Sequence, residues 1–174
     1  LLEASITHDD AVRTFGLDPT KRTILIVGGS LGARTLNESM LQAWDTLGKS
    51  DVQFIWQTGK YYHEQITAQL RGRELPNVHV CDFISSMDAA YAAADLIISR
   101  AGAGSISEFC LLGKAVILVP SPNVAEDHQT KNALALVNKE AALYVKDADA
   151  TAKLVVLALA TVEDEDKLAQ LRTN

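Results

Sequence analysis

The fold of this chain is decided by the stretch Ser99-Arg100-Ala101-Gly102-Ala103-Gly104-Ser105-Ile106-Ser107-Glu108-Phe109-Cys110-Leu111-Leu112-Gly113-Lys114-Ala115-Val116-Ile117-Leu118-Val119-Pro120. It follows a short apolar run and contains two early glycines that allow a tight turn. Ser105 and Glu108 have the spacing of a capping box, which predicts the start of a helix. Gly113 is suited to end that helix, and the apolar residues after it are typical of a buried strand. A glycine turn before a helix N-terminus either presents backbone N–H groups to an anion or simply connects two elements.

Apolar runs and amphipathic segments alternate on both sides of this stretch. We expect strands at residues 23–27, 52–56, 78–81, 96–98, 115–119 and 143–145, and helices at 36–47, 61–70, 86–94, 127–139, 149–162 and 164–171. Parallel strands need crossover helices between them, so this order predicts an α/β fold with a doubly wound, six-stranded parallel Rossmann-like sheet.

Ligands of such sheets bind beyond the carboxyl ends of the strands. The segments 28–32, 82–86, 100–105 and 120–129 each follow an expected strand. We therefore expect these four loops to lie together at one edge of the sheet and to act on the same ligand.

Composition bounds the function and the domain organisation. The chain of 174 residues is long enough for one domain with a good core, and its net charge of −6 argues against a nucleic-acid partner. The longest apolar run, 154–160, is too short to span a bilayer. The chain begins at Leu1 without a methionine, which favours an excised domain. We expect residues 1–20 to be an interdomain linker or the start of the domain, 21–162 the domain itself, and 163–174 a truncated C-terminal helix.

The first glycine-rich loop allows a reactive role and a simpler one. The run Gly28-Gly29-Ser30-Leu31-Gly32 fits the nucleophile elbow of a serine hydrolase, with Asp127 and His128 later in the chain. The same loop has a simpler use as a turn that contacts a phosphate or another backbone segment. It lacks the dinucleotide fingerprint and the lysine of a Walker loop, and no cluster of metal-ligand spacing occurs.

Two polar side chains near the expected edge can bind hydroxyl groups. Glu108 either caps its helix or accepts hydrogen bonds from a ribose diol, as acidic residues do in doubly wound folds. Gln129 lies in a polar helix start and carries both a donor and an acceptor suited to sugar hydroxyls.

Five motifs in this order resemble the C-terminal, donor-binding domain of the MurG family of bacterial N-acetylglucosaminyltransferases. They cover roughly residues 20 to 145 and comprise Gly28–Arg34, Asp82-Phe83-Ile84, Ser99–Ala103, Ser105–Glu108 and Glu126–Ala133. His128 stands where some members carry glutamine, and Gly104 where some carry a bulkier apolar residue.

The resemblance implies one half of a GT-B fold in an inverting, metal-independent enzyme that makes lipid II from lipid I and UDP-N-acetylglucosamine (UDP-GlcNAc). It implies a substrate-binding set in which Ser30 touches the donor, the Ile84 backbone reads the uracil edge, and Glu108 binds the ribose. It further implies that the remaining contacts come from Gly102, Ala103 and Ser105 at the diphosphate and from His128 and Gln129 near the sugar.

The resemblance also implies partners and a location. The acceptor domain is absent from this chain, no catalytic residue lies in it, and the fragment alone is expected to be soluble, to bind donor and to be inactive. The full-length enzyme would act on lipid I as a peripheral protein at the cytoplasmic face of the bacterial inner membrane, with no cofactor. The alternatives are another UDP-GlcNAc-using GT-B enzyme, such as an epimerase or a glycolipid synthase, a serine hydrolase, and a nucleotide-binding module without catalysis.

Overall fold

The structure is a computed structural model that describes residues 7–27, 33–82, 84, 87–100, 114–119, 142–145 and 149–173. In this part of the chain six strands form one sheet. They are β1 (Thr23–Val27), β2 (Gln53–Gln57), β3 (Val78–Cys81), β4 (Leu96–Ser99), β5 (Val116–Leu118) and β6 (Leu143–Tyr144). The six expected strands are therefore confirmed, with ends that differ by a residue or so.

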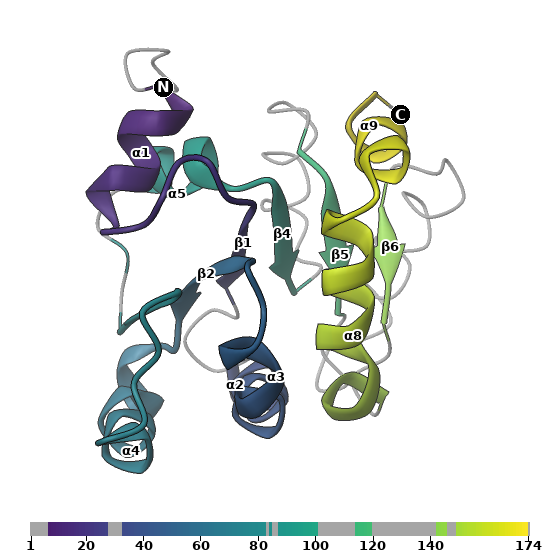
Figure 1. The fold of residues 1–174 in the computed structure, drawn as a ribbon. Coiled ribbons are helices and arrows are strands. Elements are labelled where there is room, and N and C mark those ends of the chain that lie inside the picture. The colour runs from purple at the N-terminus through teal and green to yellow at the C-terminus, as the bar shows by residue number, and fades with distance from the viewer. Residues whose placement is uncertain are drawn as a thin grey trace.

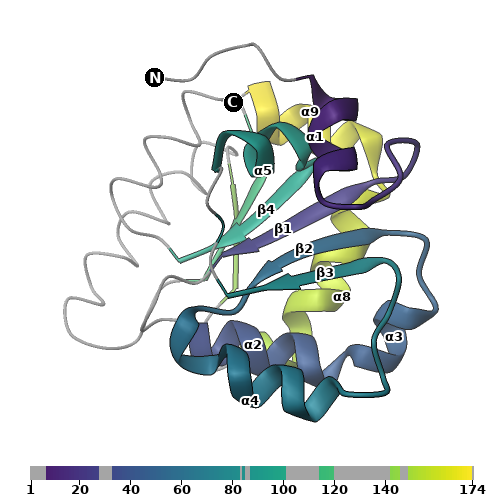
Figure 2. The same cartoon turned by 90° about the vertical axis from the view of Figure 1, so that its left-hand side faces the viewer.

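The sheet has the order β3-β2-β1-β4-β5-β6, and every pair of neighbours is parallel. This is the strand order of a doubly wound dinucleotide-binding sheet, in which the direction of winding reverses between the first and the fourth strand. The expected α/β class and parallel sheet are confirmed. Figure 2 shows the arrowheads of β1, β2, β3 and β4 pointing to the same side of the molecule.

The central strands are apolar throughout because both of their faces are covered. All five residues of β1 are buried, and its alternate side chains enter two different clusters. Ile24 and Ile26 face one layer of helices, whereas Leu25 and Val27 face the other. A run without polar alternation is the pattern that a parallel sheet between two helical layers produces.

One layer consists of α2 (Ala33–Gln42), α3 (Trp44–Gly48), α4 (Lys60–Leu70) and α8 (Ala150–Val162), with residues of α9 (Glu165–Thr173) completing its core. Figure 1 shows α2, α3 and α4 together below the sheet. The sequence predicts a single helix over 36–47, but the structure has two. Ala43, with φ −93° and ψ 9°, leaves the helical conformation and separates α2 from α3. The break accompanies the burial of Trp44, whose indole N–H donates to the Arg73 carbonyl at 2.8 Å.

The opposite layer contains α1 (His8–Thr14) and α5 (Met87–Ala93), which pack against each other (Figure 1). Helix α1 lies within the segment that the sequence suggests is a linker or the start of the domain. Its Ala11 and Val12 are fully buried, and Thr7 caps it by accepting from the Asp10 N–H. A threonine three residues before an aspartate is a capping signature that the sequence analysis overlooked.

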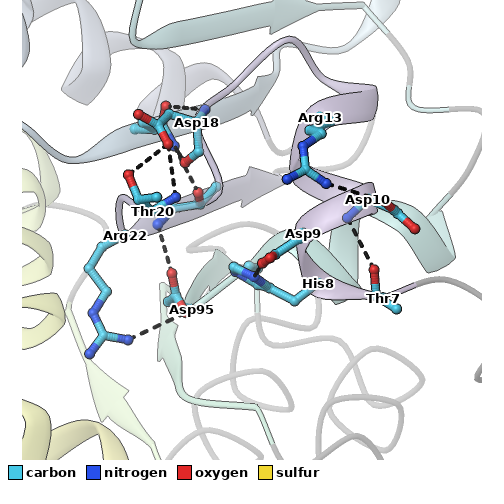
Figure 3. A network of polar contacts seen from close by, with 12 residues as sticks. Thr7, His8, Asp9, Asp10, Arg13, Asp18, Thr20, Arg22 and Asp95 are labelled. Atoms are coloured by element: carbon cyan, nitrogen blue, oxygen red, sulfur yellow. Dashed lines mark hydrogen bonds and ion pairs between the residues drawn. The ribbon is translucent and has the colours of Figure 1, made fainter.

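The chain between α1 and β1 turns tightly. Asp18 accepts hydrogen bonds from both the backbone N–H and the hydroxyl of Thr20, as the turn signal Asp18-Pro19-Thr20 predicts. These bonds hold the pKa of the Asp18 carboxyl below its usual value. Figure 3 shows this turn beside the contact between Arg22 and Asp95.

Candidate functional site

The carboxyl ends of the strands form a continuous row of residues. The registers pair Cys81 with Gln57, Gln57 with Val27, Val27 with Ser99, and Ser99 with Leu118. The residues that follow these ends are where the loops 28–32, 82–86, 100–105 and 120–129 begin. Their starting points therefore share one edge of the sheet, which places the candidate site there.

The strands β4 and β5 are tied together at this edge by Arg100. Its guanidinium Nη1 donates to the Val119 carbonyl at 3.2 Å, and the Val119 N–H donates to the Ser99 carbonyl at 2.9 Å. Ser99 in turn donates from its hydroxyl to the Arg100 carbonyl at 3.0 Å. These bonds fix the spacing of the two chain segments that leave β4 and β5.

The end of β2 is held by a buried polar network. Asn37 of α2 accepts from the Trp56 indole N–H at 2.8 Å and donates to the Thr58 carbonyl at 3.0 Å. All three residues are buried, with Asn37 only 3% exposed. After the end of β2 the backbone continues to pair with the end of β3 and the residue that follows it. The N–H groups of Thr58 and Gly59 donate to the carbonyls of Cys81 and Asp82.

Ile84 is the one site residue of the sequence analysis that the structure describes. It is 4% exposed, and its backbone N–H donates to Oε1 of Gln57 at 2.9 Å. The sequence analysis did not single out Gln57. The available signal was its position, a polar residue that follows the apolar centre of the strand (Phe54, Ile55 and Trp56) directly before Thr58 and Gly59.

Cys81 closes β3 beside Gln57, and its thiol is half-buried. Burial, assisted by the negative charge of Asp82, raises the pKa of this thiol to about 11. A thiol that stays protonated at neutral pH is a poor nucleophile and a poor metal ligand. Within the described residues, no group of three or more His, Cys, Asp or Glu side chains could hold a metal ion.

The other residues of the expected site lie outside the described residues. They are Ser30, Gly102, Ala103, Ser105, Glu108, His128 and Gln129. The expected helix at 127–139, the helix that starts near Ser105, and Cys110 are outside them as well. What the structure describes is the edge from which these segments leave.

This edge belongs to a fold with known relatives. The model of the glycosyltransferase family 28 C-terminal domain matches residues 23–174. The chain belongs to this family. A UDP-N-acetylglucosamine–N-acetylmuramyl-(pentapeptide) pyrophosphoryl-undecaprenol N-acetylglucosamine transferase of Bacteroides fragilis is 62% identical over 176 residues, covering 100% of this chain and 46% of that enzyme. The chain spans about half the length of the curated relatives it matches.

Solved structures share the same architecture. The crystal structure of MurG from Acinetobacter baumannii matches 98% of this chain and 50% of that one, with a TM-score of 0.75 and 30% identity. The sheet and its two helical layers are thus those of one half of a GT-B glycosyltransferase. A UDP-N-acetylglucosamine 2-epimerase matches with a TM-score of 0.66 over 99% of this chain and 42% of that one, but at 14% identity it shares the fold alone.

In the part of the chain that the structure describes, no helix combines the length and the apolarity needed to cross a membrane.

Proposed function

We propose that this chain is the donor-binding half of an inverting glycosyltransferase that moves N-acetylglucosamine from UDP-GlcNAc to lipid I. The product would be lipid II, an intermediate of peptidoglycan synthesis. The observation that carries the proposal is the identity of 62% over the whole chain with an enzyme named for this transfer. The shared edge from which the expected donor loops depart supports it.

The proposed donor lies across the carboxyl edge at the junction of β1 and β4. We assign Ser30 to the donor, the Ile84 backbone to uracil, and Glu108 to the ribose hydroxyls. The diphosphate would be bound by backbone N–H groups at Gly102, Ala103 and Ser105, where a helix N-terminus favours negative charge. The sugar would contact His128 and Gln129.

Backbone amides and a helix dipole can stabilise a diphosphate leaving group, so the proposed reaction needs no metal ion or other cofactor from this half. The proposal places the group that activates the acceptor, and the site for lipid I, in a second domain outside this chain. The complete enzyme would then work at the cytoplasmic face of the inner membrane as a peripheral protein. We expect this chain alone to bind the donor and to transfer no sugar.

Calorimetry of the chain with UDP and UDP-GlcNAc, in the presence of a chelator, tests the proposal. We expect saturable binding of both ligands without added metal. The absence of heat and of competition at millimolar ligand would contradict it.

Glu108→Gln supplies a matched variant, because glutamine retains the cap but loses the charge. We expect its affinity for UDP to fall roughly five- to thirtyfold, and the loss to shrink with 2′,3′-dideoxy-UDP.

The hydrolase alternative predicts a different result at Ser30. A fluorophosphonate probe is expected to leave the folded chain unlabelled. Stoichiometric labelling that disappears in Ser30→Ala would favour a serine hydrolase over a donor-binding domain.

A further inference from the structure

A groove lies between α2 and α4, which run next to each other in one helical layer (Figure 2). Its volume is about 400 Å³, which is within the range of natural small-ligand pockets. None of the residues that the structure describes along the groove belongs to the set assigned to the donor. The groove is therefore a cavity that the proposed function leaves without a role.

The walls of the groove are polar but carry no net charge. Arg34 and Glu38 stand one turn apart on α2, with Nε of the arginine 3.5 Å from Oε2 of the glutamate. They are the only charged side chains described along the groove, and their charges cancel. On α4, Gln65 and Gln69 are exposed, and within the described residues neither carboxamide has a hydrogen-bond partner. Each carboxamide can both donate and accept.

The floor of the groove combines apolar surface with one buried amide. Ile66 is buried and Leu41 partly buried. Asn37 is 3% exposed; its Oδ1 accepts from Trp56, and its Nδ2 donates to the Thr58 carbonyl. An amide nitrogen carries two hydrogens, and the second has no acceptor in the part of the chain that the structure describes. Because a buried donor without a partner is costly, an acceptor oxygen from a ligand is favoured at this point.

These features indicate which chemistry the groove accepts. Neutral walls rich in donors and acceptors suit a molecule with many hydroxyl groups better than they suit a phosphate or an amine. The floor suits an acetamido group, because its carbonyl can accept from Asn37 while its methyl packs against Ile66. The ring of Tyr62 borders the same groove and offers apolar surface to the C–H face of a sugar. A helical peptide instead needs a row of apolar anchor sites along such a groove.

We infer that the groove between α2 and α4 binds a short saccharide that contains an N-acetylamino sugar. The acetamido carbonyl accepts from Asn37, and the sugar hydroxyls bond to Gln65 and Gln69. This site goes beyond the proposed function, because it lies between two helices and not at the row of strand ends. The saccharide and the proposed donor therefore bind at the same time.

The test is an NMR titration of the chain with N,N′-diacetylchitobiose in the presence of excess UDP, which occupies the proposed donor site. We expect saturable shifts of backbone amide signals from α2 and α4. Cellobiose has the same linkage without acetamido groups, so we expect it to bind about tenfold more weakly, as the loss of one well-placed hydrogen bond predicts. The absence of saturable shifts on these helices, or equal affinity for both disaccharides, would overturn the inference.

The double variant Gln65→Ala/Gln69→Ala removes the two wall carboxamides. Both positions are exposed, so we expect urea melts to show little change in stability. The affinity for the N-acetylated disaccharide should fall about tenfold, whereas the affinity for UDP should stay the same. Gln42→Ala is the matched control, because it removes an exposed carboxamide of α2 that does not line the groove.

Two outcomes separate this site from the proposed function. If the double variant binds the disaccharide as tightly as the unaltered chain does, the groove is not the binding site and the inference is overturned. If the chain binds the disaccharide in the groove but does not bind UDP, the proposed function fails while the saccharide site stands.

Discussion

Asn37 shows how a single side chain stabilises the edge of the sheet next to the proposed site. Its carboxamide joins α2 to the end of β2 by accepting from Trp56 and donating to the Thr58 carbonyl. Trp56 also packs against Trp44, with ring centroids 6.2 Å apart. Because all of these groups are buried, none can exchange a lost protein partner for water.

We expect Asn37→Leu to lower the free energy of unfolding by about 2–4 kcal/mol, because it leaves a buried indole N–H and a buried carbonyl without partners. Urea melts measure this loss. Gln42→Leu, at an exposed position of the same helix, should change stability by less than about 0.5 kcal/mol. Adding Trp56→Phe to Asn37→Leu should cost less than the sum of the two single changes. Full additivity would mean that the two side chains are not coupled.

His79 is a second residue whose environment has a measurable consequence. Its ring meets that of Phe15 edge to face, with centroids 5.4 Å apart, and burial lowers the pKa of the imidazole. The unfolded chain therefore binds a proton at a higher pH than the folded chain does. Stability should be complete above a pH of about 6.5, the ordinary histidine value, and should fall as the pH drops below it towards the lowered folded-state pKa.

Urea melts between pH 8 and pH 5 test this dependence. We expect His79→Phe to be less sensitive to pH across this range than the unaltered chain, since it removes the titrating group and keeps a ring beside Phe15. An identical pH dependence in both proteins would exclude His79 as its source.

At the scale of elements, the turn between β2 and α4 depends on a glycine with a positive φ. Gly59 has φ 85° and ψ 145° and precedes the first residue of α4. Its N–H donates to the Asp82 carbonyl at 3.1 Å, so the turn is joined to the segment that follows β3. This backbone conformation is open to glycine and strained for residues that have a Cβ atom.

We expect Gly59→Ala to destabilise the chain by about 1–3 kcal/mol, the usual cost of such backbone strain. Gly48→Ala is a control with an ordinary backbone: a Cβ there would lie 3.1 Å from Cδ2 of Leu75, the end of a side chain that can move. Thermal or urea melts should show a much smaller change for it. Equal losses in the two variants would argue against strain at Gly59.

At the scale of the whole molecule, a charged cluster on the amino edge of the sheet joins the start of β1 to α9. Asp95 accepts from the Thr23 N–H at 2.8 Å and lies 3.9 Å from Arg172 of α9. It also lies 3.5 Å from Arg22, as Figure 3 shows. Arg22 also pairs with Glu165. Lys114, whose pKa is lowered mainly by burial, donates to the Ala94 carbonyl nearby. The cluster connects β1 and the segment before β4 with the last helix.

We expect Asp95→Asn to lower the free energy of unfolding by about 1–3 kcal/mol, because the Asp95 side chain is only 13% exposed and its charge faces several cations. Asp10→Asn is the matched control. Its carboxylate pairs with Arg13 at 3.3 Å on the surface, where such a pair contributes less than about 1 kcal/mol. Salt should reduce the loss caused by Asp10→Asn more than the loss caused by Asp95→Asn. Indistinguishable losses would mean that the cluster on the amino edge is no stronger than a surface pair.

The local pattern of apolar and polar residues was sufficient to predict much of the fold. The strand at Thr23–Val27 is a continuous run of β-branched and apolar residues, and only a sheet covered on both faces buries such a run. The end of the helix at Ala33–Gln42 could not be predicted from the sequence alone, because the break in the helical backbone at Ala43 depends on how Trp44 packs. Helix α1 is too short to be stable alone, and its Ala11 and Val12 acquire their burial from packing against α5.

The site divides in the same way. Glycine turns, capping spacings and their order along the chain depend on neighbouring residues, so the sequence by itself determined the doubly wound class and the edge of the sheet from which the loops start. Only the tertiary structure decided that the Gln57 side chain accepts a hydrogen bond from the N–H of Ile84, a residue 27 positions away. The same holds for the hydrogen bond by which Asn37 fixes the end of β2. Hydrogen bonds between distant segments leave no periodic signal in the sequence, because their geometry depends on how the strands and helices pack in space.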